Sequence, residues 1–472
     1  MQAGLRWNHD LGEPQMTRPP FGFGPSDPGE EPDPNDPFGL SKMFGGAGGD
    51  LFGQLQRLMA WTGGPVNWDL AKEVAQGAIK DADRPVTADE SQEVADAGRL
   101  ADLWLDPMTS LPAAGQEPQA WSRAGWLEGT LASWQQLVDP VAAQVTAAMG
   151  QAMEKGLSGD NLPPELSGLM SGLGPNPFAG VMQQIGGLVF GAQVGQALGA
   201  LASEVLSCTE VGIPLGRSAL LPANIGAFAD GLEVPLDEVR LYLALREAAH
   251  QRLFAHVPWL KAHLYDAVDA YARGIEVDPA AIERAVGSFD PTNPEALQEA
   301  LGSGMFELEP TAAQQSALGR LESALALVEG WVDLVVDGAA SQTLPHAAQL
   351  RETVRRRRAT GGPAEQTFAT LVGLQLRPRR LREAAQLWAA VTARRGIEGR
   401  DALWAHPDLL PGPSDLDDPT AWAGPGDDAP EGGTADWDAG LRALDKDLDG
   451  ELDEDAASPF GLDGDTGDAS PG

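Results

Sequence analysis

The sequence predicts a mainly helical protein with a small β element and a disordered tail at each end. Apolar residues recur at three- and four-residue spacings along most of the chain. A single stretch, residues 209–228, has the short apolar runs bounded by proline and glycine that are typical of extended structure. Both ends are acidic and rich in glycine and proline. No alternation of strands and helices is apparent, so a doubly wound α/β fold is not expected.

The composition divides the chain into a folded body and two tails. Residues 1–50 and 411–472 lack apolar periodicity and are expected to be disordered. The body therefore covers 51–410. Within it we distinguish an N-terminal helical part, 51–177, from a second part, 178–410, that carries the motifs described below.

The charge and cysteine content narrow the classes of function. The formal net charge of −37 argues against non-specific binding to nucleic acid or to an anionic membrane, because both repel a polyanion. Cys208 is the single cysteine, which excludes an internal disulfide and a zinc site built on thiolates. The N-terminus has no apolar segment of the kind found in secretion signals. We therefore expect a cytoplasmic protein whose partner is a protein or peptide.

The first predicted helices cover 51–80, 91–105, 119–156 and 178–206, separated by Gly/Pro breaks. The fourth contains an uncharged segment, 181–203, with glycines at every fourth position. These glycines could form the dimerisation face of a membrane helix or the close-packing face of a core helix. Its glutamines would be costly in hydrocarbon, which favours the core helix. The extended stretch 209–228 that follows could form a hairpin or an edge strand.

The next predicted helix covers residues 235–257, between Pro235 and Pro258. Its apolar stripe at three- and four-residue spacing is interrupted by two polar residues, Arg246 and His250. Both are therefore expected to point inward. A buried guanidinium needs a partner, because an unpaired charge in the interior is strongly unfavourable.

A later predicted helix, residues 310–337, carries two carboxylates beside a regular apolar seam. Glu329 and Asp333 are four residues apart, so they lie on the same face of the helix. Two carboxylates at this spacing repel each other, and a cation between them would relieve the repulsion. A solvated acidic edge would show the same pattern.

Several runs of sequence resemble one known family. Residues 246–250, Arg-Glu-Ala-Ala-His, resemble the HExxH motif, in which two histidines bind zinc and the glutamate is the general base. The runs 252–260, 377–383 and 399–410 are similar to other segments of the actinobacterial zincin-like metallopeptidases. Members of this family are often described only as hydrolases, and a sister clade is associated with deazaflavin-coenzyme biosynthesis. The resemblance covers roughly residues 50–410.

The resemblance implies a role for each motif residue. Glu247 corresponds to the general base and His250 to the second zinc ligand. Glu329 and Asp333, in the order ExxxD, resemble the second motif, with Glu329 as a ligand and Asp333 orienting a histidine behind it. The chain departs from the family at position 246, where the first histidine is replaced. Arg246 stays protonated and has no lone pair, so it cannot bind zinc.

Two hypotheses follow for the site. In the first, Arg246 and Glu329 form a bidentate salt bridge in place of the metal, and the chain is a catalytically silent homologue that acts as a binding or scaffold protein. In the second, zinc is held by His250, Glu329 and one further donor, His256 or His263, and the chain is a zinc-dependent hydrolase. The charge at position 246 favours the first hypothesis.

Two other segments are rich in charge. Residues 351–400 contain 12 Arg and four Glu. With few aromatic residues to stack on bases, this segment is expected to dock on acidic surfaces of the same chain rather than on nucleic acid. Residues 445–453 match the first nine positions of an EF-hand loop, but Ala456 replaces the bidentate glutamate at position twelve. A specific calcium site is therefore not expected.

Overall fold

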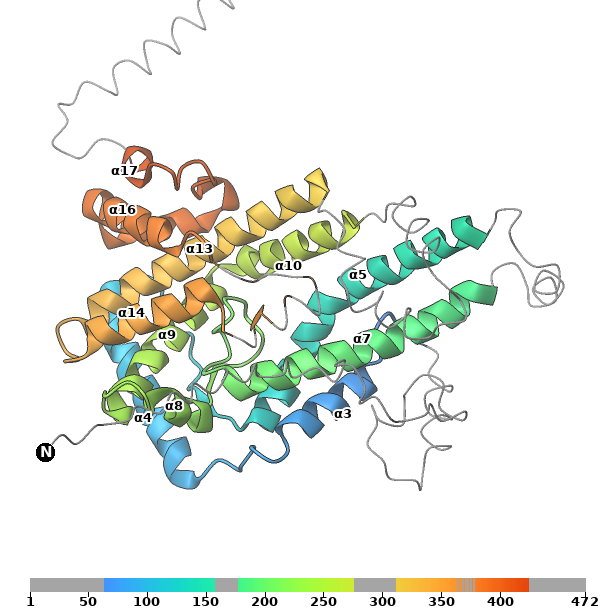
Figure 1. The fold of residues 1–472 in the computed structure, drawn as a ribbon. Helices are drawn as coiled ribbons and strands as arrows, with labels where there is room; N and C mark the ends of the chain where they lie inside the picture. The colour runs from blue at the N-terminus through green and yellow to red at the C-terminus, as the bar shows by residue number, and fades with distance from the viewer. Residues whose placement is uncertain are drawn as a thin grey trace, which may run out of the picture.

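A computed structural model describes residues 63–157, 177–275 and 311–423, apart from 363–364, 367–368, 370–372, 374–375 and 377. Helices dominate these residues, and the sheet they contain has two short strands (Figure 1). The predicted fold class, mainly helical with a small β element, is confirmed.

The α-helices are, in chain order, α3 Trp68–Ile79, α4 Ala88–Leu105, α5 Arg123–Leu157, α7 Pro177–Glu204, α8 Pro222–Ala229, α9 Leu236–His256, α10 Pro258–Arg273, α13 Ala312–Ala340, α14 Ala347–Thr360, α16 Leu381–Asp401 and α17 Pro419–Trp422. The short 3-10 helices are η1 Asp106–Met108, η2 Ala402–Ala405 and η3 Pro407–Leu409. The strands are β1 Gln119–Ala120 and β2 Ala219–Leu220, which pair in parallel.

The helix starts follow local sequence signals. Thr87 and Glu90 form a capping box at the start of α4, and Thr311 and Gln314 form one at the start of α13. In each case two backbone N–H groups that lack an intrahelical partner are satisfied by side chains. The capping box at Thr311 fixes where α13 begins, and α13 carries the two predicted carboxylates.

The small sheet corrects two predictions. The helix predicted from residue 119 begins instead at Arg123, because 119–120 form β1. Within the stretch 209–228 the only strand is β2, which pairs with β1, so the stretch does not form a hairpin within itself. Pro222 takes the first position of α8, since its fixed φ suits a helix start and its missing N–H would have no partner there. Residues 222–229 are therefore helical rather than extended.

The glycines of α7 let this helix lie directly against α3. A Cβ added at Gly191 or Gly195 would lie 2.6 Å from the carbonyl oxygens of Asn67 or Ala71, and one at Gly199 would be similarly crowded. Only glycine allows two helix backbones this close. The stripe therefore packs inside the body, as expected for a core helix. Among the described residues, no helix combines the length and the apolar character needed to cross a membrane.

The folded body extends past the predicted end at residue 410. Leu416 is 0% exposed and Ala423 is 3% exposed. Arg380 holds this segment by donating to the carbonyl of Pro413 and to the carboxylate of Asp417. These contacts come from the body and are invisible in the composition of the segment itself. The rest of the predicted tails and the 445–453 loop lie outside the described residues.

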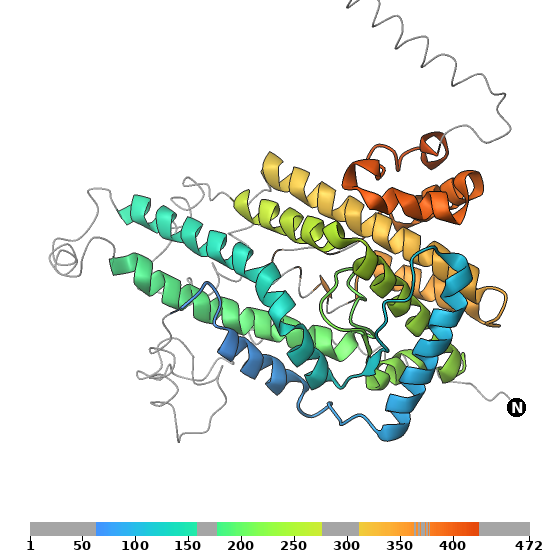
Figure 2. The same ribbon diagram turned by 180° about the vertical axis from the view of Figure 1, so that it is seen from behind.

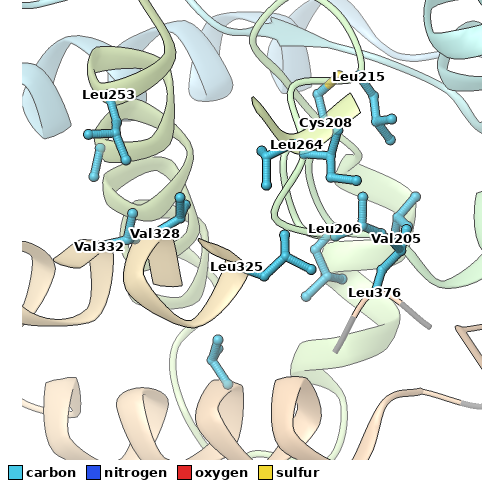
Figure 3. Close-up of a cluster of buried hydrophobic side chains, with 14 of the residues drawn as sticks. Val205, Leu206, Cys208, Leu215, Leu253, Leu264, Leu325, Val328, Val332 and Leu376 are labelled. Atoms are coloured by element: carbon cyan, nitrogen blue, oxygen red, sulfur yellow. The ribbon is translucent and has the colours of Figure 1, made fainter. Parts of the chain in front are cut away.

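Helix α13 forms the centre of the body. It packs against α16 on one side and against α9 and α10 on the other, as both views show (Figures 1 and 2). The apolar side chains of α9 and α13 meet in a buried cluster that includes Leu253, Leu325, Val328 and Val332 (Figure 3). Glu329 follows Val328 on the same helix and is itself fully buried.

Candidate functional site

Helix α9 carries the RExxH sequence into the core. The helix runs from Leu236 to His256, with Pro235 as its N-cap, and Pro258 begins the next helix. Arg246 and His250 lie one turn apart and are 7% and 1% exposed. Both point inward, as the apolar stripe predicts.

Helix α13 carries the two carboxylates. Glu329 and Asp333 also lie one turn apart, and each is 0% exposed. This burial rules out the solvated acidic edge that the sequence left open. Two ionised carboxylates in the interior need positive partners close by.

The structure brings Arg246, His250 and Glu329 together. Arg246 Nη2 donates to Glu329 Oε2 at 2.5 Å, and His250 Nε2 lies 3.4 Å from Glu329 Oε1. The Nδ1 of His250 lies 2.8 Å from the carbonyl oxygen of Arg246 and is the donor of this bond, because a carbonyl only accepts. The salt bridge differs from the bidentate arrangement we predicted, since Arg246 contacts one oxygen of Glu329 and leaves the other to different partners.

One of those partners, Arg358, was not identified as a site residue from the sequence. It comes from α14, is 2% exposed, and places Nη2 at 3.2 Å from Glu329 Oε1. Its Nη1 lies 3.5 Å from Glu365. The run of arginines from 355 to 358 was a visible signal, but nothing in the run indicates which member reaches the core.

Burial and charge have opposite effects on the ionisation of Glu329. Burial alone would raise the pKa of Glu329, but its interactions with Arg358, His250 and Arg246 together hold this pKa well below its usual range. Burial alone would likewise lower the pKa of Arg246, and the charge of Glu329 outweighs that effect and raises it. The carboxylate and the guanidinium therefore both stay charged inside the core.

This network predicts a loss of stability in acid. The pKa of Glu329 is lower in the folded chain than in the unfolded chain, where it is about 4.3. The contribution of ionised Glu329 to the free energy of unfolding is therefore complete above the pKa of the unfolded chain. It is lost as the pH falls through the pKa of the folded chain. The free energy of unfolding in urea is measured between pH 6 and 3 for the native chain and for a Glu329→Gln variant. Below about pH 4.3 it should fall more steeply with pH for the native chain, and the two slopes should differ by up to about 1.4 kcal/mol per pH unit. Parallel curves would contradict the prediction.

Asp333 has a different environment from the one the resemblance implies. It accepts hydrogen bonds from Arg351 and Arg355, with the closest contacts at 2.8 Å and 2.6 Å. Arg351 also contacts Asp337 one turn further on α13. In the structure Asp333 thus pairs with two arginines of α14 rather than with a histidine. The arginine-rich segment docks here on carboxylates of its own chain.

Glu247, the general base of the motif, is held by neutral hydrogen-bond donors. Its Oε2 accepts from the backbone N–H of Thr209 at 3.1 Å and from the hydroxyl of Thr209 at 2.5 Å. Its Oε1 accepts from Gln251 at 2.9 Å. Glu247 is 1% exposed. Both oxygens of this buried carboxylate are engaged, and through Thr209 it holds the loop before β2 against α9.

The site residues do not fit a zinc ion. His250 and Glu329 are the donors that come together, while Arg246 and Arg358 both place positive charge on the same carboxylate. Among the described residues, no group of three or more His, Cys, Asp or Glu side chains is arranged to hold a metal. His256 is exposed at the end of α9, and His263 packs on α10 with its ring 5.6 Å from that of Trp259. Neither supplies a third donor.

A helical body in which one helix carries RExxH and a second helix faces it with ExxxD has the motif layout of a zinc peptidase without its full ligand set. Residues 66–423 match the zincin-like metallopeptidase family, and the chain belongs to that family. A solved structure from Chloroflexus aurantiacus, described as a "putative hydrolase with a novel fold", has a similar fold with a TM-score of 0.52. It is 18% identical in sequence, and the likeness covers 76% of this chain and 97% of that one. No curated protein matches the sequence.

Proposed function

We propose that this chain is a non-catalytic member of its family that acts as a binding or scaffold protein, with a protein or peptide as its partner. The observation that carries the proposal is the environment of Glu329. This carboxylate, which the motif would place on zinc, is ion-paired with two buried guanidiniums. A guanidinium has no lone pair and remains charged, so it replaces the metal as counter-charge but cannot activate water.

The position of Glu247 supports the same proposal. A general base must reach the proton that it abstracts, directly or through one water. Catalytic zinc sites also keep one coordination position open to solvent and substrate. Glu247 is committed to Thr209 and Gln251, and the site as a whole is buried.

Metal content and peptide hydrolysis together test the proposal. The purified full chain is incubated with zinc and then dialysed. Its zinc content, measured by inductively coupled plasma mass spectrometry, should be well under one zinc per chain. The chain should also hydrolyse a mixed peptide library no faster than its Glu247→Gln variant. His263→Ala is the matched control for His250→Ala, because His263 lies outside the site. Neither substitution should change the residual zinc content. Stoichiometric zinc that is lost in His250→Ala alone, with hydrolysis that is lost in Glu247→Gln, would establish the zinc hydrolase instead.

A further inference from the structure

We propose that Arg358, together with Arg246, supplies the positive charge that a metal ion would bring to Glu329. Exclusion of divalent metal from this site then depends on Arg358 as well as on Arg246. This inference rests on the proposed function and assigns a role to a residue outside both motifs. Two guanidiniums, each with one positive charge, supply the double charge that a zinc ion would bring to Glu329.

The division of contacts on Glu329 carries the first step. Oε2 is 2.5 Å from Arg246 and Oε1 is 3.2 Å from Arg358, so each oxygen faces one guanidinium. The two arginines come from α9 and α14 and approach from different helices. Both are buried, and Arg358 is the more buried of the two at 2%. The carboxylate therefore has two cationic partners that water does not screen.

The spacing of the two remaining donors carries the second step. His250 Nε2 and Glu329 Oε1 are 3.4 Å apart. Two ligands of one tetrahedral zinc, each about 2.0–2.2 Å from the ion, are separated by a similar distance. Oε1 is also the atom that Arg358 contacts. A cation bridging His250 and Glu329 would therefore lie next to the guanidinium of Arg358 and be repelled by it.

The loop before β2 lies next to Arg358 and Glu329. Gly212 has φ +80, a conformation that favours glycine. A Cβ at Gly212 would lie 3.3 Å from Arg358 Nη2 and 3.4 Å from Glu329 Oε1. A side chain at this position would contact both groups of the ion pair, so glycine lets the loop backbone lie close to Arg358 and Glu329.

From this arrangement it follows that restoring the first histidine is not sufficient to restore metal binding. R246H would complete the HExxH sequence, but Arg358 would still place its positive charge 3.2 Å from Oε1 of Glu329. Removal of the second guanidinium in R246H/R358M should make the carboxylate available to the ion. The matched control is R246H/R357M, because Arg357 is the adjacent arginine on α14 and pairs with Glu210 rather than with Glu329.

Zinc titration of the purified full-length variants by calorimetry tests the proposal. We expect R246H/R358M to bind one zinc per chain about 100-fold more tightly than R246H. R246H/R357M and the charge-conserving R246H/R358K should both bind as weakly as R246H. If R246H/R358M folds poorly without metal, its thermal unfolding midpoint should rise on addition of zinc while that of R246H/R357M does not.

The outcomes separate this inference from the proposed function. R246H that binds zinc as tightly as R246H/R358M would overturn the role of Arg358 and leave the proposed function intact. An R246H/R358M variant that neither binds zinc nor gains thermal stability from it would also overturn the role of Arg358 and leave the proposed function intact. Stoichiometric zinc on the unsubstituted chain would instead overturn the proposed function.

Discussion

Replacing Glu329 with glutamine is expected to destabilise the protein by about 3–5 kcal/mol, because it leaves buried positive charge without its counter-charge. Arg246 and Arg358 lose their shared carboxylate, their side chains are 9% and 3% exposed, and Arg358 keeps only the longer contact of 3.5 Å to Glu365. Neither can turn to water without leaving the core. The free energy of unfolding in urea measures the effect.

Asp333→Asn is the matched control for this substitution. Asp333 is as buried as Glu329 and also pairs with two arginines, but the side chains of Arg351 and Arg355 are 23% and 21% exposed. Arg351 keeps a second partner in Asp337. These arginines can be hydrated when the charge is removed, so we expect a smaller loss of about 1–3 kcal/mol. A Glu329→Gln effect no larger than that of Asp333→Asn would show that the buried ion pairs around Glu329 are not the main contribution.

The second large effect is expected at Asp401, where one carboxylate joins three parts of the chain. Its Oδ2 accepts from the hydroxyl of Thr109 and the backbone N–H of Ser110, both at 2.7 Å. Its Oδ1 accepts from the indole of Trp331 at 2.9 Å and from Arg400 Nε at 2.7 Å. Asp401→Ala leaves these donors without their acceptor, and three of them, Thr109, Trp331 and the guanidinium of Arg400, are buried. We expect a loss of about 3–5 kcal/mol in the free energy of unfolding.

A second ion pair of the same residue types serves as the control for Asp401. Asp417 pairs with Arg380 at 2.7 Å, but its side chain is 72% exposed. Exposed pairs contribute at most about 1 kcal/mol, so Asp417→Ala should lie within that limit. Comparable losses for Asp401→Ala and Asp417→Ala would contradict the role of burial in this argument.

Much of the fold was predictable because helical periodicity is a local signal. The inward orientation of Arg246 and His250 follows from the apolar stripe of α9 alone. The parallel pairing of β1 with β2 was not predictable, since it joins segments about a hundred residues apart and each strand is only two residues long. Contacts from Arg380, the N-cap residue of α16, likewise hold the segment after residue 410, although its own composition resembles a tail.

The site was predictable to the extent that two motifs mark its two helices. The spacing of RExxH and ExxxD, with the family resemblance, led to the expectation that Arg246 and Glu329 face each other, and the structure places their head groups in contact. The contribution of Arg358 was not predictable. It depends on how α14 docks against α13, and one arginine in a run of four has no local feature that distinguishes it.

The binding site of added zinc, located in crystals of the unsubstituted protein grown with zinc, tests the central claim most directly. Anomalous scattering at the zinc edge identifies the ion independently of its surroundings. The account predicts no zinc within bonding distance of His250 Nε2 and Glu329 Oε1, with Arg246 and Arg358 still paired to the carboxylate. An ordered zinc about 2.0–2.2 Å from both atoms would contradict it.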